Sequence, residues 1–329
     1  HSGIPVFARE LNCIGALCVI LKDALKPNIV QTCEHTPVLV HCGPFGNIAH
    51  GSNSVRATKL ALKLAPYVVT EAGFAADLGA EKFVNIKCRQ AGLKPNAAVL
   101  VATVRALKYH GGEDKNNLKI ENIEALKKGC ENLRTHAENI GKYGLPLVVA
   151  INRFPTDTPA ELDIIRQFCE EIGIESSLSE VVSRGGDGGL DLAKKIKKIV
   201  DETPGQPNYY YENSDPIKSK IETVAREIYR ADGVDFTEEA EISIQLLEEN
   251  NLANLPICMA KTQSSLSDDP KKINAPRGWR LQVREVKVSN GAGFIVALTG
   301  KMMLMPGMPN QSAVQKIDID SDGLITGLS

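Results

Sequence analysis

Short apolar runs alternate with amphipathic segments along the chain up to about residue 200. The apolar runs predict buried strands at 37–42, 67–70, 97–104 and 145–151. Apolar residues at helical spacing predict helices at 6–24, 52–64, 123–140, 159–172 and 190–200. Apolar strands that alternate with amphipathic helices are typical of a parallel sheet covered on both faces. The sequence therefore predicts an α/β fold.

Two of these helices carry clear start signals. Ser52 or Asn53 is placed to cap the helix at 52–64. Thr158 and Glu161 form the S/T-x-x-E pattern of a capping box, and Pro159 stands at the first helical position. We expect the second helix to begin at Pro159.

The pattern changes near residue 203, where proline, glycine and three tyrosines predict a connection. Beyond it, Asp215-Pro216 and Thr237 are expected to begin two helices. Strands then dominate, and we predict them at 256–260, 279–288 and 294–298. This indicates three domains with boundaries at 1–140, 141–230 and 231–329, the last of them α+β.

The composition is that of a soluble globular protein and narrows the range of partners. The 329 residues are 43% hydrophobic and 24% charged, with a formal net charge of −2. Such a chain has no global field that favours nucleic acid or an anionic membrane. It has no apolar stretch long enough to span a membrane, and no signal peptide is expected.

The cysteines suggest a reducing compartment. None of the eight forms a C-x-x-C pair, and most lie in apolar or helical runs. Reduced, buried cysteines behave in this way in cytosolic proteins, so we expect a cytoplasmic location. Cys33, His35, His41 and Cys42 lie close enough to consider zinc, but alternate side chains at a strand end point to opposite faces. No metal site is predicted.

Ligands of an open parallel sheet bind beyond the carboxyl ends of its strands, so the segments after each predicted strand are the candidates for chemistry. The segment 43–51 after the first strand holds three glycines before a helix start, and suits either an anion or a tight turn. After the second strand, Glu71 and Asp77 could meet a cation or a nucleotide, or could be solvated loop carboxylates. Asn152 and Asp157 follow the fourth strand and are candidates by analogy with nucleotide-binding sheets.

Three further features leave alternatives open. The run 185–189, Gly-Gly-Asp-Gly-Gly, is either a mobile lid or a close backbone approach. His50 and His110 each stand beside glycine, where a lone histidine is more often structural than catalytic. No Ser-His-Asp order and no H-E-x-x-H motif accompanies them.

Eight segments in one order resemble the formate–tetrahydrofolate ligase family. They are HTPVLVHCGPFGNIAHGSNSVRATKLAL, YVVTEAGFAADLGAEKF, ATVRALKYHGG, AINRFPTDTPAEL, SLSEVVSRGGDGG, NLPICMAKTQSSLSDDP, VSNGAGFIVALTG and MPGMPN. The resemblance covers essentially the whole chain. It implies the carboxyl-terminal part of a P-loop NTPase-like domain, whose parallel sheet would be incomplete here, followed by smaller α/β and α+β domains.

The resemblance also implies a reaction. ATP, formate and tetrahydrofolate would give 10-formyltetrahydrofolate, ADP and phosphate through formyl phosphate. Mg²⁺ accompanies ATP in this family, a monovalent cation such as K⁺ or NH₄⁺ activates it, and homotetramers are common. The expected partners are therefore small-molecule substrates and further copies of the chain.

Matching positions suggest which residues take part. The loop with Gly43, Gly46, Asn47 and His50 resembles the family's nucleotide-side wall. The TEAGF turn, with Glu71 and Phe74, resembles the other part of that wall. Phe154, Leu178 and Val182 match positions that hold the folate pterin ring. No catalytic residue is assigned.

Three departures from the family pattern affect these expectations. Val182 stands where related sequences read SEVW, which is expected to weaken pterin stacking, and Ser264 stands where tyrosine or histidine is more usual. The sequence also lacks the glycine-rich phosphate loop with its lysine, which the family carries in its amino-terminal half. We therefore expect this chain alone to be inactive. The alternatives are a folate- or nucleotide-binding module, or an oligomerisation module, without catalysis.

Overall fold

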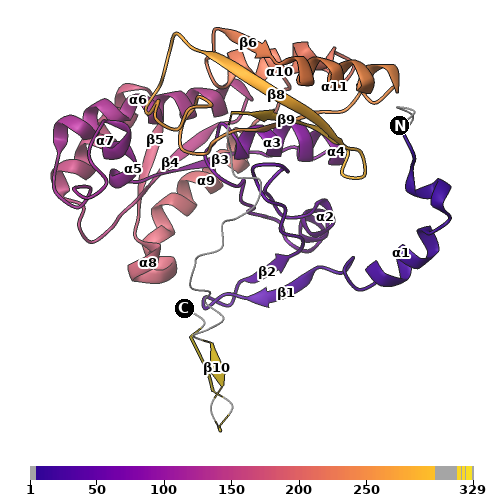
Figure 1. The fold of residues 1–329 in the computed structure, drawn as a ribbon. Coiled ribbons are helices and arrows are strands. Elements are labelled where there is room, and N and C mark those ends of the chain that lie inside the picture. Colours follow the sequence, from indigo (N-terminus) through magenta and orange to yellow (C-terminus); the bar gives the residue numbers. More distant parts are fainter. Residues whose placement is uncertain (1–4, 301–316, 320, 323, 328–329) are drawn as a thin grey trace.

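The computed structural model describes residues 5–300, 317–319, 321–322 and 324–327, and contains two larger sheets and two short hairpins (Figure 1). The motif MPGMPN lies outside the described residues. The architecture is mixed α/β, as predicted, but the strands are distributed among the sheets differently from the prediction.

One sheet is parallel and has three strands. β3 (Ala98–Ala102), β4 (Leu147–Asn152) and β5 (Glu175–Ser179) lie in that order. The first two confirm predicted strands. β5 was not predicted because its sequence, ESSLS, is mostly polar, although Ser177 and Ser179 are buried. The carboxyl ends of all three strands meet at one edge of the sheet.

Helices cover both faces of this sheet. Leu178 of β5 packs in the cluster formed with α5 (Val104–His110), α6 (Ile123–Lys142) and α7 (Pro159–Glu171). On the opposite face, the Ser177 hydroxyl donates to Asp191 of α9 (Leu190–Glu202) over 2.6 Å. The capping box at Thr158 is present, so the predicted start of α7 is confirmed.

The second sheet is mixed and has four strands. They are β6 (Gly233–Phe236), β7 (Ile257–Ala260), β8 (Arg280–Ser289) and β9 (Phe294–Thr299), in the order β6-β8-β9-β7. β8 and β9 are antiparallel, whereas β6 pairs with β8 and β7 pairs with β9 in parallel. Three of these strands were predicted; β6 is short and was missed.

The mixed sheet is buried on both faces. Its outer face packs against α10 (Ile217–Glu227) and α11 (Glu238–Glu249), which lie above it in Figure 1. Its inner face packs against Ile86 of the π-helix η2 (Phe83–Cys88), between α3 (Gly79–Lys82) and α4 (Arg89–Ala91). Thr237 caps α11 through its side chain, as predicted, whereas α10 begins after Pro216 without a side-chain cap.

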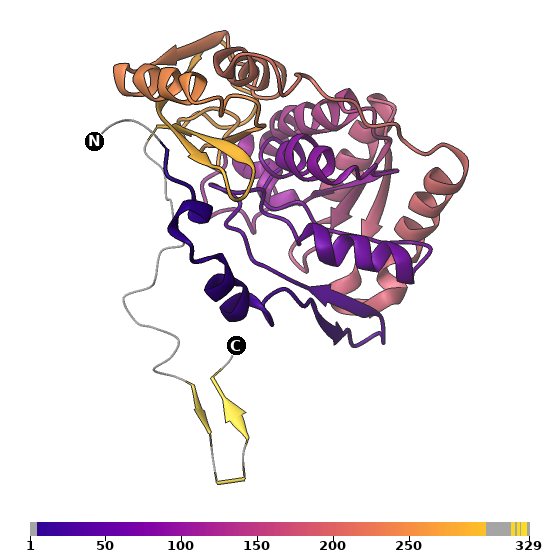
Figure 2. The same cartoon turned by 90° about the vertical axis from the view of Figure 1, so that its right-hand side faces the viewer.

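The amino-terminal region departs most from prediction. The strand expected at 37–42 is β2 (Pro37–Val40), which pairs antiparallel with β1 (Asn28–Gln31) and takes no part in the parallel sheet. The helix expected at 6–24 is divided into η1 (Ala8–Leu11) and α1 (Ile14–Leu21), and neither has a buried residue. Figure 2 shows these two helices apart from the body of the molecule.

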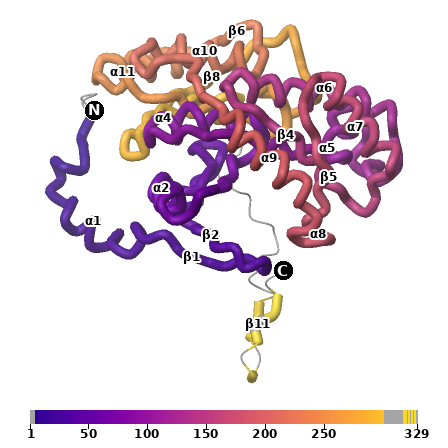
Figure 3. The backbone as a smooth tube through the Cα atoms, turned by 180° about the vertical axis from the view of Figure 1, so that it is seen from behind, coloured from indigo at the N-terminus to yellow at the C-terminus, as the bar shows by residue number. Residues whose placement is uncertain are grey.

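Two smaller predictions are also corrected. The segment 67–70 is not a strand, and Val69 is 93% exposed. α2 (Val55–Leu64) is capped by Ser54, because Asn53 is bound to the backbone of β2 instead. Seen from behind, the chain runs from α1 along β1 and β2 beneath α2 (Figure 3).

The remaining elements are short. They are α8 (Val181–Arg184), the 3₁₀ helix η3 (Gly185–Gly189), and the pair β10 (Asp318–Ile319) and β11 (Ile325–Thr326).

Candidate functional site

The glycine-rich loop 43–51 connects β2 to α2 and is anchored on the inner face of the mixed sheet. Ile48 and Ala49 pack against the cluster that contains Ile86, Phe294 and Val296. The amides of Ile48 and Ala49 both donate to the carbonyl of Phe45, over 3.2 and 3.0 Å. The loop is therefore a fixed turn.

Three glycines in and beside this loop allow a close backbone approach. A Cβ at Gly51 would lie 2.7 Å from the Cα of Gly46, and one at Gly73 would lie 2.6 Å from the carbonyl oxygen of Gly51. The amide of Gly73 donates to that same oxygen over 3.2 Å. Gly43 differs, since nothing lies within 4 Å of the position of its Cβ. The TEAGF turn and the loop thus form one wall.

Two aromatic rings border this wall. Phe45 and Phe74 meet edge to face with ring centroids 6.1 Å apart, and Phe74 is 45% exposed. Phe74 has φ of +63°, which is unusual for a bulky residue. Backbone strain of this kind concentrates at functional sites. Glu71, at the start of the same turn, is exposed.

A buried lysine holds the loop from below. The ammonium of Lys82 donates to the carbonyl of Gly46 over 2.6 Å and to that of Asn47 over 3.0 Å. Lys82 and Asn47 are both buried. Lys82 was not singled out from the sequence, because a lysine in a helical segment ordinarily indicates the solvent face.

His50 lies near two positive charges. Burial lowers its pKa most, followed by the ammonium groups of Lys87 and Lys82. Its Nδ1 lies 3.1 Å from the hydroxyl of Ser52. Lys87 is buried against the ring of Phe83 and its ammonium has no hydrogen-bond partner among the described residues, so burial lowers its pKa to about 8. Because the pKa of His50 is lowered below its ordinary value of 6.5, its imidazole is mainly neutral at pH 7.

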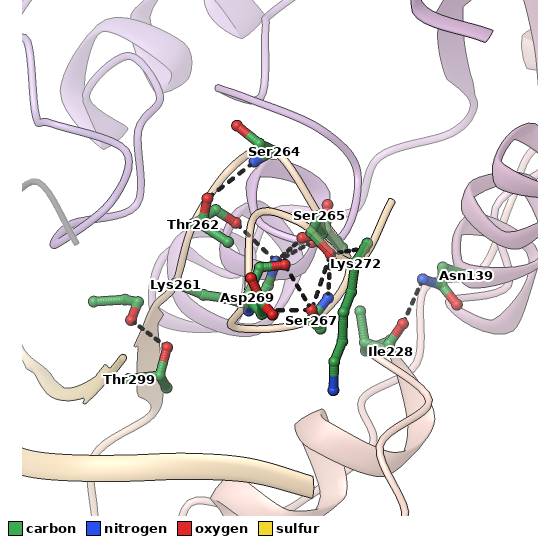
Figure 4. A network of polar contacts seen from close by, with 12 residues as sticks. Asn139, Ile228, Lys261, Thr262, Ser264, Ser265, Ser267, Asp269, Lys272 and Thr299 are labelled. Atoms are coloured by element: carbon green, nitrogen blue, oxygen red, sulfur yellow. Dashed lines mark hydrogen bonds and ion pairs between the residues drawn. The ribbon is translucent and has the colours of Figure 1, made fainter. Parts of the chain in front are cut away.

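Asp77 is neither a solvated carboxylate nor a ligand-facing one. It is buried, and its Oδ2 lies 2.9 Å from the ammonium of Lys261. Lys261 also donates to the carbonyls of Thr262 and Ser265, at the centre of the polar network in Figure 4. This ion pair ties the TEAGF region to the loop after β7.

Ser264 lies at the exposed end of that network. Its amide donates to the hydroxyl of Thr262 over 3.3 Å. Nothing in the structure explains the replacement of a tyrosine or histidine here.

The second group of predicted residues lies at the carboxyl edge of the parallel sheet. Phe154 follows β4 and is half-buried, with the guanidinium of Arg105 4.3 Å from its ring centroid. Leu178 of β5 is half-buried against the helices on that face. Val182 is 88% exposed in α8. Asp157, whose carboxylate accepts from the amide of Phe154 over 2.8 Å, fixes the turn.

The glycine segment 185–189 approaches the tip of the amino-terminal hairpin. The amide of Gly186 donates to the carboxylate of Glu34 over 2.8 Å. Gly185 has φ of +56°, and its Cβ would lie 2.4 Å from that carboxylate. Of the two readings of this segment, a close approach is the one that these contacts support.

The remaining candidates have structural partners. His110 accepts from the amide of Asn274 over 3.0 Å, and both ring nitrogens of His41 lie 2.7 Å from other groups, Ser54 and the carbonyl of Ala24. In the part of the chain that the structure describes, no group of three or more His, Cys, Asp or Glu side chains is placed to hold a metal ion. No helix there is long and apolar enough to cross a membrane.

The glycine wall and the sheet edge that carries Phe154 belong to a mixed α/β protein. A family model described as formate–tetrahydrofolate ligase matches residues 1–329. The chain therefore belongs to the formate–tetrahydrofolate ligase family, the ATP-dependent ligases of one-carbon folate metabolism.

Proposed function

We propose that this chain supplies the nucleotide-side wall and the folate-side surface of a ligase that makes 10-formyltetrahydrofolate. In that reaction formate attacks the γ-phosphorus of ATP, which releases ADP and forms formyl phosphate. N10 of tetrahydrofolate then attacks the formyl carbon, and phosphate leaves.

The packing of Gly46, Gly51 and Gly73 is the observation that carries the nucleotide part of the proposal. Three backbones without Cβ atoms pack directly against one another and form a fixed surface, which suits close approach of a phosphate or a flat base. Asn47, His50 and Phe74 lie in the same wall, and Glu71 opens the turn at its border. The backbone of the loop is already fixed before a ligand binds. It can therefore orient a nucleotide, together with the neutral imidazole of His50, without first changing its conformation.

Phe154 and Leu178 support the folate part. Phe154, a half-buried aromatic residue, lies just beyond the carboxyl end of β4, and Leu178 lies one residue before the end of the neighbouring strand β5. Ligands of parallel sheets bind at this edge. A pterin stacked on Phe154 would gain about 0.5–1.5 kcal/mol beyond its area burial. Val182 offers only an exposed aliphatic surface for the same ring.

We also propose that the 329-residue chain does not turn over by itself. Its sequence contains no G-x-x-x-x-G-K-[ST] segment. Phosphoryl transfer depends on a lysine at the β- and γ-phosphates and on Mg²⁺ held by a hydroxyl, and it loses its main electrostatic stabilisation without them.

The direct test is turnover with ATP, Mg²⁺, K⁺, formate and tetrahydrofolate. Acid converts any 10-formyl product to the methenyl form, which absorbs light and can be quantified. We expect no product, but we expect binding of ADP and of tetrahydrofolate in calorimetry. Phe154→Ala should weaken folate binding and leave ADP binding unchanged. Product formation by the pure chain would overturn the inactivity, and equal folate binding by Phe154→Ala would overturn the folate site.

Homo-oligomerisation and a cytoplasmic location are part of the same proposal. The exposed apolar side chains of the amino-terminal helices, such as Leu11, Val19 and Ile20, support self-association. The location rests on the cysteine pattern, although only half of it is as expected: four free cysteines are buried, whereas Cys18, Cys33 and Cys42 are exposed.

A further inference from the structure

Lys82 is a buried cation that donates two hydrogen bonds to the glycine-rich loop. Its ammonium donates to the carbonyls of Gly46 and Asn47, from a position with no solvent exposure. Burying an ammonium is costly unless polar groups replace its water, and here the backbone of the loop supplies them. The loop and the lysine are therefore energetically dependent on each other.

The position of these two carbonyls determines the shape of the turn. A trans peptide places its N–H opposite its C=O, so turning two successive carbonyls toward Lys82 fixes the planes of two successive peptides. The turn in which Ile48 and Ala49 donate to the carbonyl of Phe45 contains both of these peptides. Without the ammonium, two buried carbonyls would lose their donor, and the loop would have to rotate to satisfy them.

The same loop carries the close approach to the TEAGF turn. Gly46 lies under Phe74, where a Cβ would be 2.9 Å from the ring, and beside Gly51. A rotation of the backbone at Gly46 would therefore shift the wall formed by the loop and the TEAGF turn, which is the proposed nucleotide-binding surface. Lys82 itself is on α3, behind this wall, and makes no exposed surface.

We propose that Lys82 is a positioning residue for the nucleotide: its buried ammonium holds the loop in the shape that receives the ligand. This inference rests on the proposed nucleotide function of the loop. A loop that is ordered before binding loses less conformational freedom on binding, so the effect is on affinity.

Lys220 provides a matched control within the same chain. It is equally buried, and its ammonium donates to the carbonyls of Asn213, Ala253 and Leu255 over 2.6–3.0 Å. These carbonyls lie in segments before α10 and β7, away from the loop in sequence. Lys220→Met removes the same kind of buried cation without touching the wall.

The experiment compares the 329-residue chain with its Lys82→Met, Lys82→Gln and Lys220→Met variants. ADP affinity is measured by calorimetry, amide hydrogen exchange of residues 44–52 by mass spectrometry, and folding by thermal denaturation. We expect Lys82→Met to weaken ADP binding by about tenfold or more and to speed exchange in the loop. Lys82→Gln, which keeps a donor, should fall between it and the parent chain. Lys220→Met should lower the Tm and change neither of the other readouts.

The outcomes separate the two proposals. Unchanged loop exchange and unchanged ADP affinity in a folded Lys82 variant would overturn the positioning role. If Lys82→Met does not fold, Lys82→Gln decides the question by the same criteria. If the parent chain itself does not bind ADP, the nucleotide function of the loop is refuted, while faster loop exchange in Lys82→Met alone would still show that Lys82 orders the loop.

Discussion

At the scale of single residues, the glycines of the wall are not equivalent. Gly51 has φ of +64° and its Cβ would lie 2.7 Å from the Cα of Gly46, so an alanine there is strained by its backbone and by contact. We expect Gly51→Ala to lower the free energy of unfolding by about 2 kcal/mol or more. Gly43→Ala is the control, because open space surrounds it, and should change stability by less than about 0.5 kcal/mol.

Urea unfolding monitored by circular dichroism measures both variants. Equal effects of the two substitutions would show that the close packing of Gly46, Gly51 and Gly73 does not exist in solution.

Glu81 is expected to make stability depend on pH. It is buried, and burial raises its pKa to about 7 despite a hydrogen bond from Asn85 and the charge of Lys82, while Asp77 raises it further and Arg89 opposes. The folded pKa lies above the unfolded value near 4.5, so the folded state holds the proton more tightly. Its contribution is fully present below pH 4.5 and is lost as the pH rises through 7.

Glu81→Gln removes this dependence. Between pH 4.5 and 7.5 the parent chain should lose about 3 kcal/mol more stability than the variant, since each pKa unit corresponds to about 1.36 kcal/mol. Denaturant titrations at several pH values give the two slopes. Parallel curves for parent and variant would mean that Glu81 titrates normally in the folded protein.

At the scale of helices, one carboxylate joins three of them. Glu161 is buried on α7, caps it by accepting from the amide of Thr158, and lies 2.7 Å from the ammonium of Lys108 on α5. It also accepts from the amide of Asn122 at the start of α6 over 3.3 Å. Glu161→Gln keeps the shape but leaves Lys108 buried without a counter-charge, so we expect a loss of about 3–5 kcal/mol.

The exposed pair of Asp163 and Arg166 on the same helix is the control. Their atoms are 2.7 Å apart, but both side chains are about half exposed. Asp163→Asn should therefore cost less than about 1 kcal/mol. Thermal denaturation ranks the two variants, and a loss for Glu161→Gln as small as the control would contradict the buried ion pair.

The elements that could be predicted are those whose local pattern matches their environment. α7 has a capping box, and β4 is apolar up to its last residue, Asn152, so both were predicted near their observed bounds. β5 was missed because its buried Ser177 donates to α9, and α9 in turn donates to the carbonyl of Ser176, which no local pattern reveals. The segment 67–70 has strand-forming residues but no neighbouring strand. Pairing is decided by the whole fold.

The same limit applies to the site. The glycine loop and Phe154 follow β2 and β4, so their places in the fold could be predicted from the sequence, whereas the strand expected before the TEAGF turn is absent. The buried charges could not, because Glu81, Lys82 and Lys87 stand in a helical stretch that resembles a solvated face. Their environment is created by the mixed sheet, which is contributed by residues far along the chain.

At the scale of the whole molecule, the amino-terminal helices present apolar surface to solvent. None of the residues of α1 is buried, and Val19 and Ile20 are each 76% exposed. Apolar area removed from water contributes about 25 cal/mol per Å², so association of such surfaces is favourable. We expect the chain to self-associate at micromolar concentration, as measured by light scattering coupled to size-exclusion chromatography.

The double variant Val19→Lys, Ile20→Lys tests which surface is responsible. Both residues belong to α1, which lies apart from the body (Figure 2), and neither is buried. The substitutions should therefore shift the chain toward the monomer without changing its Tm. Ile242→Lys, at a residue 54% exposed on α11, adds a charge to a different exposed apolar site and should leave the association unchanged. A parent chain that is monomeric at every concentration would refute the self-association. An assembly that resists the double variant but dissociates with Ile242→Lys would place the interface on α11 instead, because only the surface that is covered in the assembly is sensitive to a new charge.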